Sequence, residues 1–523
     1  MKNERDYLLY VLPVPRSEPE PEPAPVEGRP QQPGGLCWLT FPERPSAADR
    51  AAADGEAAAV AASQSGAADE EVPKFFTAPP SHQTLNIVRE NFVPFLQPQH
   101  PSQGDHRWLV IWNDHAGRRL AKKWLVAVIL PILHLVGIPP SDLQVFESRQ
   151  NGWEDYLVKS THPKRSTKVI ILGGDGTISD FINQAQDSLQ ERKRLDLDDG
   201  SNPIKMDLII LPFGTANAMF FNAHPTVKEL DRPKDILTGL LNALLEPTRM
   251  ADGLPEPSPS RLTLASVETL DHTNTLVQGS VSFVVTSTAL HASILDTANQ
   301  LVLQPDYQPT GTEVFKQAFL KSVAQTWKAS VTLLPSAQDG LIQRYDPSIE
   351  TLVPVRMDAQ DANAREVRLE GPFSYFTACL VDRLESKFMI APLRNPVRFP
   401  LSDESTRSST IDVIIIRPTR DPGLKLLLED AHSSSQLRAD ALTNFIGVVM
   451  QAAYQDGLHI NLLANDRLPI VEYYRCGGWT WSPTDEDLKH QVCIDGKVLE
   501  IPGNGGSVKC TILSPDQTDI RIY

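Results

Sequence analysis

Two short apolar runs each end in a glycine turn that leads into a helix. The first run, Lys168–Leu172, is apolar and β-branched in the manner of a buried parallel strand. After its glycine pair the spacing changes, and Ile178, Phe181 and Ile182 fall on one helical face. The second run, Met206–Leu211, is followed in the same way by a glycine turn and an apolar helix. The pattern predicts two strand–turn–helix units of an open α/β sheet, with their turns lining one crevice.

The N-terminal 82 residues lack this periodicity. Pro15–Pro33 is rich in proline and glutamate, and Ala47–Glu71 is rich in alanine with scattered acids. Segments of this kind bury too little apolar surface to offset the entropy of ordering them. We therefore expect residues 1–82 to form a mostly disordered tail. Two apolar stretches, Tyr7–Pro13 and Cys37–Phe41, are exceptions that predict either docked strands or short motifs for a partner.

Residues 83–246 continue the α/β pattern on both sides of the two glycine turns. Arg107–Trp112 predicts a first strand, and Leu120–Leu135 predicts the helix after it. An amphipathic pattern at Asp235–Leu245 predicts the last helix of the unit. We therefore predict an α/β domain over 83–246.

From residue 247 the pattern changes to many short, often alternating apolar runs separated by turn residues. This texture predicts a β-rich, sandwich-like second domain over 247–523, with a disordered insertion near 421–436. One helix is predicted at Glu313–Lys328, where an apolar stripe indicates either core packing or one wall of a ligand tunnel. The predicted strands are Arg261–Val267, Thr275–Ser287, Ser330–Leu334, Thr351–Met357, Val367–Leu369, Tyr375–Val381, Ile411–Arg417, Ile470–Tyr474, Gln491–Ile494 and Val508–Leu513.

Composition narrows the classes of function. The chain of 523 residues has 65 acidic and 49 basic side chains and a net charge of −16, with no basic tract. A nucleic-acid binder is disfavoured, because it would need cations to offset phosphate. The five cysteines lie far apart without a CxxC pair, which indicates neither zinc nor a disulfide framework and fits a reducing compartment.

Membrane contact, if the protein makes it, is expected to be peripheral. The longest apolar run, Trp124–Ile138, is interrupted by Pro131 and His134 and is too short to cross a bilayer. The N-terminus is charged and proline-rich, so no secretory signal is indicated. We expect a cytoplasmic protein that associates peripherally with intracellular membranes.

The first glycine turn carries the clearest candidate chemistry. Gly173, Gly174 and Gly176 let backbone amides approach phosphate oxygens without a Cβ in the way. Asp175 lies between them and is a candidate general base or anchor for a metal and its water. The alternative is an ordinary turn with a solvated aspartate.

The second turn repeats these features. Gly214 and Thr215 open the helix after the second run, and Asn217 lies in its first turn. A further anion site is predicted after the first strand, where Gly117 and Arg118 precede a helix N-terminus. A solvated basic helix start is the alternative there.

Asp180 has two interpretations. Together with Thr177 it has nearly the spacing of a capping box, in which the acid bonds back to the amide at the start of the helix. The alternative is a contact with a nucleotide, a metal or the substrate.

The motif GGDGT, followed by Asp180 and Asn183 and then by FGTANA at 213–218, resembles the diacylglycerol kinase catalytic-domain family. GGDGT alone also occurs in NAD kinases and resembles a phosphofructokinase motif, whereas the second corner points to the lipid-kinase branch. The resemblance extends over Arg107–Leu513 and is most specific in its N-terminal third. It implies a nucleotide-binding α/β domain, a lipid-binding β-rich domain, ATP and Mg²⁺.

Several residues take roles by this resemblance. Asp175 would be the catalytic base or the Mg²⁺ anchor, and Asp495–Lys497 would be a turn that returns to the nucleotide. The chain departs from the family where Asp114 replaces a proline and Lys497 replaces an acid. The implied nucleotide contacts are Asn113, Gly117, Arg118, Gly173, Gly174, Gly176, Thr177, Gly214, Thr215, Asn217, Asp495, Gly496 and Lys497.

Ser282–Pro335 resembles the substrate segment of the sphingosine-kinase branch. Ser293 stands where that branch has an aspartate for the lipid head group, with Asp296 three places on. No lysine or arginine occurs between Arg261 and Lys316, although the family usually has a basic residue there for phosphate. The implied substrate contacts are Asp180, Ser293, Asp296, Phe315 and Phe319.

The sequence therefore predicts an ATP-dependent kinase that phosphorylates a sphingoid long-chain base. Diacylglycerol or ceramide is the alternative acceptor. A catalytically weak lipid- or nucleotide-binding protein is a second alternative, motivated by Ser293, Lys497 and the missing basic residue. NAD kinase is a third, which FGTANA and the large second domain argue against. The lipid would be presented at a membrane surface, and the sequence leaves a homodimer open.

Overall fold

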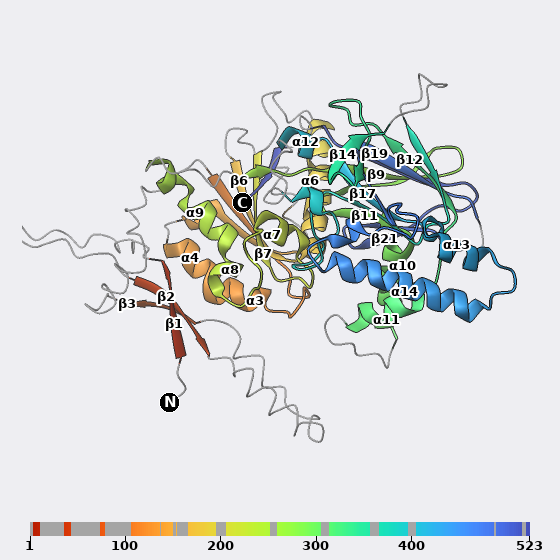
Figure 1. The fold of residues 1–523 in the computed structure, drawn as a ribbon. Coiled ribbons are helices and arrows are strands. Elements are labelled where there is room, and N and C mark those ends of the chain that lie inside the picture. Colours follow the sequence, from red (N-terminus) through yellow and green to blue (C-terminus); the bar gives the residue numbers. More distant parts are fainter. Residues whose placement is uncertain are drawn as a thin grey trace, which may run out of the picture.

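The computed structural model gives the chain two main parts (Figure 1). The α/β part lies to the left in this view and the β-rich part to the right, and the C-terminus ends in the α/β part. The described residues are 4–10, 36–42, 74–78, 106–135, 138–149, 153, 166–194, 205–251, 259–304, 313–355, 366–395, 404–485, 488–514 and 519–523.

The α/β part is built on a six-stranded sheet with the order β5-β4-β6-β7-β23-β8. Its first five strands run parallel, and β8 runs antiparallel to β23. The α/β domain predicted from the two strand–turn–helix units is confirmed. The strands are β4 (His106–Trp112), β5 (Leu143–Glu147), β6 (Ser166–Gly173), β7 (Lys205–Pro212), β8 (Ser260–Arg261) and β23 (Asp519–Ile522).

Helices cover both faces of this sheet. Alternate side chains of β4 pack in two different hydrophobic cores, because successive side chains of a strand point to opposite faces of the sheet. Leu109 and Ile111 pack in one core with Ile178 of α6, and Val110 packs in the other with Trp124 of α3. The helices are α3 (Ala121–Trp124), η3 (Leu125–Ile129) and α4 (Leu130–Leu135), which run on as one helix, and α6 (Asp175–Arg194), α7 (Ala218–Ala223), α8 (Pro233–Ile236) and α9 (Thr238–Ala251).

The C-terminal strand β23 differs from the sequence prediction, which assigns all of 247–523 to the second domain. It lies between β7 and β8, with Ile520 and Ile522 buried. The amide of Tyr523 donates to the carbonyl of Leu208 at 3.0 Å and extends this pairing. A four-residue alternating strand carries no signal for its partner, which is a contact across more than 300 residues.

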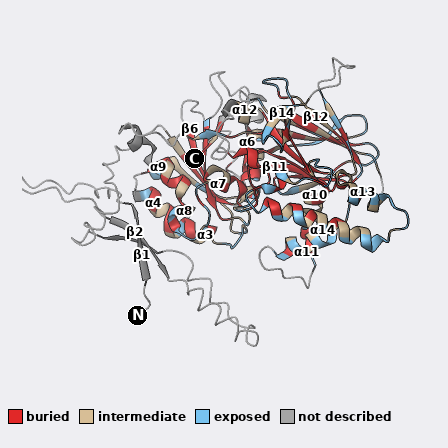
Figure 2. Ribbon diagram, viewed as in Figure 1, coloured by how far each residue is buried: buried red, intermediate tan, exposed pale blue. Residues whose placement is uncertain are grey.

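The β-rich part is a sandwich of a six-stranded and an eight-stranded antiparallel sheet, as predicted. Phe376 of β16 lies in the larger sheet, and its ring is 4.9 Å from Trp479 and 5.4 Å from Trp481 of β19 in the smaller sheet. Figure 2 shows these strands as the buried interior of this part. The orders are β10-β9-β22-β19-β12-β15 and β14-β13-β18-β17-β16-β11-β20-β21.

The strands of the smaller sheet are β9 (Ala265–Leu270), β10 (Leu276–Ser282), β12 (Ala329–Leu334), β15 (Val367–Glu370), β19 (Gly478–Pro483) and β22 (Ser507–Ile512). Those of the larger sheet are β11 (Val285–Thr288), β13 (Gln343–Asp346), β14 (Thr351–Pro354), β16 (Tyr375–Cys379), β17 (Ile411–Ile416), β18 (Val471–Cys476), β20 (Gln491–Ile494) and β21 (Lys497–Glu500). The helices are α10 (Ala289–Val302), α11 (Glu313–Ser322), α12 (Glu404–Ser408), α13 (Pro422–Glu429) and α14 (Ser435–Ala453).

The insertion that was expected to be disordered is instead ordered as α13 and the start of α14. Asp421 caps α13 by accepting from the amide of Leu424 at 2.8 Å, and Pro422 follows at the first helical position. Ser434 caps α14 by accepting from the amide of Leu437 at 3.1 Å. These are standard N-terminal capping signals, so the polar residues near 421–436 mark helix starts.

The predicted helix Glu313–Lys328 ends earlier, at Ser322. Trp327 instead forms a bridge with Phe373, in which each amide donates to the other residue's carbonyl at 2.8 Å. Its buried ring belongs to the sandwich core, so the apolar stripe is at least partly core packing.

A small antiparallel sheet, with β2 in the middle, forms from three N-terminal segments: β1 (Glu4–Tyr10), β2 (Leu36–Pro42) and β3 (Lys74–Ala78). β1 overlaps the predicted apolar stretch Tyr7–Pro13 in part, and β2 contains the predicted stretch Cys37–Phe41. The rest of the tail predicted to be disordered lies outside the described residues.

The two main parts are joined through polar contacts as well as through the chain. Asn183 of α6 pairs with the edge strand β10: its Oδ1 accepts from the amide of Val281 at 2.8 Å and its Nδ2 donates to the Val281 carbonyl at 3.0 Å. Farther along, the Asn222 side chain accepts from the amide of Asp382 at 3.1 Å. Side-chain amides that satisfy backbone groups across the junction fix how the two parts meet.

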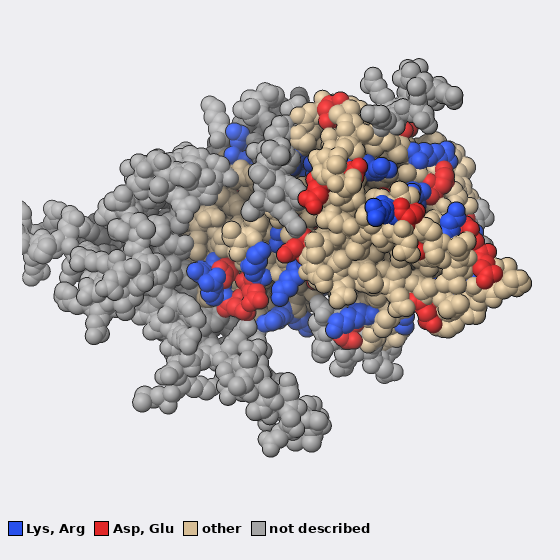
Figure 3. Space-filling model, in the orientation of Figure 1, with Lys and Arg blue, Asp and Glu red and all other residues tan. Residues whose placement is uncertain are grey.

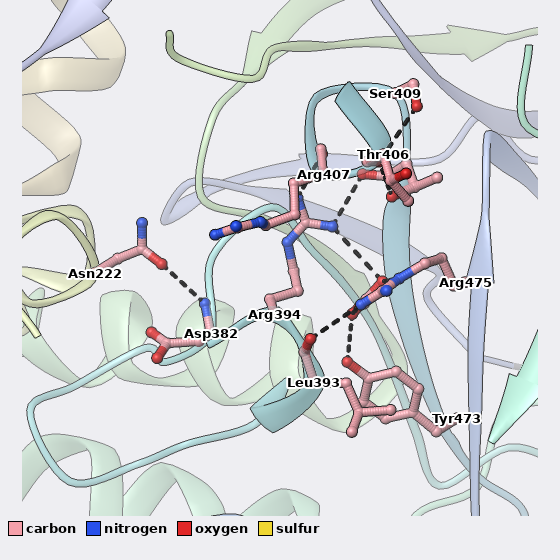
Figure 4. Close-up of polar contacts among 11 residues, drawn as sticks. Asn222, Asp382, Leu393, Arg394, Thr406, Arg407, Ser409, Tyr473 and Arg475 are labelled. Atoms are coloured by element: carbon pink, nitrogen blue, oxygen red, sulfur yellow. Dashed lines mark hydrogen bonds and ion pairs between the residues drawn. The ribbon is translucent and has the colours of Figure 1, made fainter. Parts of the chain in front are cut away.

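A buried ion network stabilises the second part (Figure 4). Arg475 donates to both oxygens of Asp412 at 2.7 and 2.8 Å, and the Tyr473 hydroxyl donates to Asp412 at 2.5 Å. Arg394 lies 3.6 Å from the same carboxylate and donates to the carbonyls of Thr410 and Arg407. Each of these charged groups is therefore paired inside the protein.

Candidate functional site

The two glycine corners that the sequence predicts as neighbouring walls of one crevice are in direct contact. A Cβ on Gly174 would lie 2.7 Å from the Cα of Gly214, and a Cβ on Gly214 would lie 2.4 Å from the Cα of Gly174. Such distances leave no room for a side chain at either position. The prediction that the corners meet is confirmed, and glycine is required at both because two backbones pack together.

Asp175 joins the two corners. It is the first residue of α6, and its carboxylate accepts from the amides of Ala218 at 2.8 Å and Met219 at 3.0 Å, at the start of α7. Burial raises the pKa of Asp175, whereas these two hydrogen bonds lower it. Each carboxylate oxygen has a further lone pair besides the one used by these bonds, so the group can still accept a proton or hold a cation.

Asn217 closes the second corner. Its backbone is left-handed, with φ of 53°, a conformation that asparagine tolerates better than most residues. Its Oδ1 accepts from the amide of Gly214 at 2.8 Å, and its Nδ2 donates to the carbonyl of Gly214 at 2.9 Å. The side chain is buried and its hydrogen bonds are used within the turn. The side chain therefore shapes the turn, its predicted nucleotide contact stays a prediction, and Thr215 beside it is exposed.

The loop after β4 adds a third wall. The amide of Asn113 donates to the carbonyl of Leu172 at 3.0 Å, and its side chain donates to the hydroxyl of Thr177 at 2.9 Å. Gly117 has φ of +49°, and a Cβ there would lie 2.3 Å from the carbonyl oxygen of Phe213. Arg118 is exposed next to it. The predicted residues of this loop therefore do converge on the two glycine corners.

Asp495 binds the chain itself. Its Oδ1 accepts from the hydroxyl of Ser282 and the amides of Val284 and Val285 at 2.8 to 3.0 Å, and its Oδ2 accepts from the amide of Phe283 at 3.0 Å. The carboxylate is buried, and burial raises its pKa to about 6. The carboxylate thus holds the segment that joins β10 to β11, and its predicted contact with the nucleotide stays a prediction. This also explains why the predicted strand Thr275–Ser287 is interrupted.

The rest of that turn lies near α6, the helix that follows the first glycine corner. Gly496 has φ of +95°, which favours glycine, and Lys497 after it is exposed. Burial raises the pKa of Asp180, and the charge of Lys497 lowers it. Lys497 therefore lies close enough to α6 to act on the second turn of that helix.

Asp495→Asn is expected to destabilise the protein by about 1–3 kcal/mol, the cost of leaving a buried polar group unpaired. The amide can keep one acceptor for Ser282, Val284 and Val285, but its NH₂ then faces the amide of Phe283. Urea unfolding of the variant and the wild type at pH 8, where the carboxylate is ionised, measures the difference. Equal unfolding midpoints would contradict the assigned role.

A cavity of about 240 Å³ lies between α10 and α11. Its lining is mostly polar, and within it the Ser293 hydroxyl donates to that of Ser322 at 3.1 Å. Ser293, Thr297 and Gln300 of α10 are spaced four and three residues apart and so lie on one helical face. This spacing is the signal in the sequence that could have identified the α10 side of the cavity. The lining residues are Ser293, Thr297, Gln300, Leu301, Gln304, Lys321, Ser322 and Gln325.

The other residues predicted to contact substrate lie elsewhere. Asp296 accepts from Gln300 at 2.8 Å and lies 3.8 Å from Nζ of Lys489. Phe315 packs on a small apolar cluster between α10 and α11, and Phe319 packs against the main core. Of the substrate residues predicted in α10 and α11, Ser293 is the one that lines the cavity.

A magnesium ion at this site would need few protein ligands. Among the described residues no group of three His, Cys, Asp or Glu side chains is placed to hold a metal. Mg²⁺ in phosphoryl-transfer sites is commonly held by one or two carboxylates together with phosphates and water. Asp175, at the junction of the two glycine corners, fits that requirement.

Comparison with known proteins agrees with this geometry. Residues 107–250 match the family model of the diacylglycerol kinase catalytic domain. The matched segment includes all three loops described above, from Asn113 to Asn217. The match supports a kinase, and it ends before the β-rich part. No curated protein matches the chain.

The chain is also weakly similar to solved structures, among them two kinases. A diacylglycerol kinase from Bacillus anthracis strain Sterne is 12% identical, with 80% of this chain and 96% of that chain covered and a TM-score of 0.39. Yeast NADH kinase in complex with NADH is 7% identical, with 80% of this chain and 84% of that chain covered and a TM-score of 0.33.

Within the described residues, none of the helices has the length and apolar character needed to cross a membrane.

Proposed function

We propose that the protein is an ATP-dependent lipid kinase that transfers the γ-phosphoryl group to the hydroxyl of a sphingoid long-chain base. The observation that carries this proposal is the contact between the two glycine corners, with Asp175 at their junction, inside a domain that matches a kinase family. Glycine-lined backbone at the carboxyl ends of parallel strands suits phosphate groups. Phosphoryl transfer needs positioning and charge neutralisation more than covalent chemistry, and this site offers both.

Each part of the site has a task in that reaction. The amides of Gly174 and Gly176 are our candidates for contacts with the nucleotide phosphates, whereas the amide of Gly214 already donates to Asn217 within the turn. Mg²⁺, when bound, would neutralise charge on those phosphates. Asp175 either takes the proton of the acceptor hydroxyl or anchors the metal, and its raised pKa makes it a better base than an ordinary carboxylate.

The cavity between α10 and α11 is our candidate site for the polar end of the lipid. Beside it, exposed apolar side chains stand out from the two helices: Val302 is 55%, Leu303 82% and Leu320 68% exposed. A lipid acceptor has to be taken from a membrane, so we propose that this end of the second part works at a membrane surface. We also propose that the protein associates peripherally with intracellular membranes from the cytoplasm. The proposal does not depend on whether the protein forms a homodimer.

Diacylglycerol or ceramide is the second candidate acceptor, and one observation favours it. The described cavity lining holds a cation, Lys321, and no carboxylate. The ammonium group of a sphingoid base would lack an anionic partner there, whereas neutral lipids need none. The resemblance of Ser282–Pro335 to the sphingosine-kinase branch supports the sphingoid base instead.

Purified protein with radiolabelled ATP and a panel of sphinganine, diacylglycerol, ceramide and NAD would test these proposals. Label on sphinganine alone supports the first candidate, and label on diacylglycerol or ceramide supports the second. Label on NAD would replace both with an NAD kinase. ATP binding without transfer to any acceptor would favour a catalytically weak family member.

Lys497→Glu is expected to raise the ATP KM about tenfold, which corresponds to about 1.4 kcal/mol. Lys497 lies near Asp180 on the helix that follows the first glycine corner, so the new carboxylate would repel the nucleotide phosphates. Lys509→Glu makes the same charge change at an exposed position of β22 and serves as the control. An unchanged ATP KM in Lys497→Glu would remove Lys497 from the nucleotide contacts.

A further inference from the structure

One oxygen of the Asp114 carboxylate is buried and has no hydrogen-bond partner among the described residues. Asp114 follows Asn113 at the carboxyl end of β4, and the buried oxygen is its Oδ1. A buried carboxylate oxygen usually accepts from an amide, a hydroxyl or a cationic side chain. Leaving this oxygen unpaired is unfavourable. We therefore expect a ligand that can pair with a carboxylate to bind at this position.

The loop around Asp114 is held in place by its neighbours. Asn113 is bound to Leu172 and Thr177, and its own Oδ1 accepts from the amide of His115 at 2.9 Å. Gly117 packs on the carbonyl of Phe213. Asp114 thus lies on a fixed loop that meets both glycine corners, where the nucleotide phosphates would bind.

Asp175, the other carboxylate of this site, is partly occupied. Each of its oxygens already accepts an amide from the start of α7. These bonds withdraw negative charge from the group that would hold Mg²⁺. A second carboxylate, with an oxygen that accepts no hydrogen bond from the described residues, would complete an oxygen-rich site of the kind that Mg²⁺ prefers.

We propose that Asp114 is a second carboxylate for the Mg²⁺ of the bound nucleotide, an inference that rests on the proposed function. An apolar ligand would leave the buried oxygen unpaired, and a phosphate group alone would be repelled by it. A divalent cation that also binds phosphate satisfies both. The chain thereby acquires an acid at a position where the related family has proline.

The test is binding of Mn²⁺, as a substitute for Mg²⁺, to the ADP complex of the purified full chain, measured by electron paramagnetic resonance. Asp114→Asn is expected to weaken Mn²⁺ binding at least tenfold and to leave binding of metal-free ADP unchanged. It should also keep or raise the melting temperature of the ligand-free protein, because a negative charge with one buried, unpaired oxygen is removed. A purely structural aspartate would instead lower it.

Asp187→Asn is the matched control, since Asp187 is an exposed acid on α6 and the change removes the same charge. It should leave Mn²⁺ binding as in the wild type. Equal Mn²⁺ affinity in Asp114→Asn and the wild type would overturn the inference and leave the proposed function standing. A loss of affinity accompanied by a lower melting temperature would also overturn it. If the wild type binds neither ADP nor Mn²⁺–ADP, the proposed function itself fails.

Discussion

Asp175→Asn is expected to reduce phosphoryl transfer by about 10²- to 10⁴-fold, the usual contribution of a positioned general base. Asparagine cannot take a proton and does not neutralise a metal. The structure adds a second effect, because one oxygen that accepts from Ala218 or Met219 becomes an NH₂ group facing an amide. Initial rates at saturating ATP and lipid measure the first effect, and a thermal melt measures the second.

The pH dependence separates the catalytic role from the structural one. Burial raises the pKa of Asp175, so the base becomes protonated at a higher pH than an ordinary carboxyl group. The wild-type rate should therefore fall as pH is lowered through this raised pKa, whereas the residual rate of Asp175→Asn should not follow that titration. Asp187→Asn should behave as the wild type. Near-normal turnover in Asp175→Asn would show that Asp175 is neither base nor metal anchor.

The sequence predicts the parts of the site that depend on local signals. A β-branched run, a glycine pair and a change to helical spacing are enough to place Gly174 and Asp175 at the end of a strand. The second corner at Gly214 follows from the same signals. That the two corners meet follows from the rule that ligand-binding turns gather at the carboxyl ends of neighbouring parallel strands.

The same reasoning is less reliable for what a polar side chain binds. Asn217 and Asp495 stand in the right motifs, yet the structure pairs one with its own turn and the other with the segment at 282–285. Both are short polar side chains beside unpaired backbone amides, and such amides compete with any ligand for them. Motif spacing places the residue but does not decide that competition.

Contacts between distant segments leave the weakest trace in the sequence. β23 joins the sheet of the α/β part, and Asn183 pairs with the edge strand β10. No periodic pattern in the sequence predicts either contact. The Ser293 cavity needs α10 and α11 to come together, which depends on tertiary packing. Asp114 is the opposite case: its departure from the family was visible, but its buried, unpaired oxygen required the structure.

Asp412→Ala is expected to lower the free energy of unfolding by about 3–5 kcal/mol, the range for removing one partner of a buried ion pair. Its side chain is fully buried, and without it Arg475 and Arg394 would keep their charge inside the protein with no carboxylate beside them. Urea unfolding at pH 7 measures the loss. Asp440→Ala on the exposed side of α14 is the control, and a surface change of this kind is usually within about 0.5 kcal/mol.

Acid unfolding tests the same network independently. Burial alone would raise the pKa of Asp412, but Arg475 and Arg394 outweigh it and hold that pKa below its usual range. An acid with a depressed pKa in the folded state stabilises the protein above its unfolded pKa and loses that effect as pH falls. The wild type should therefore lose stability on acidification more steeply than Asp412→Asn, which keeps the shape of the side chain without its charge. Parallel acid profiles, or an Asp412→Ala loss no larger than that of Asp440→Ala, would show that the arginines are neutralised by other groups.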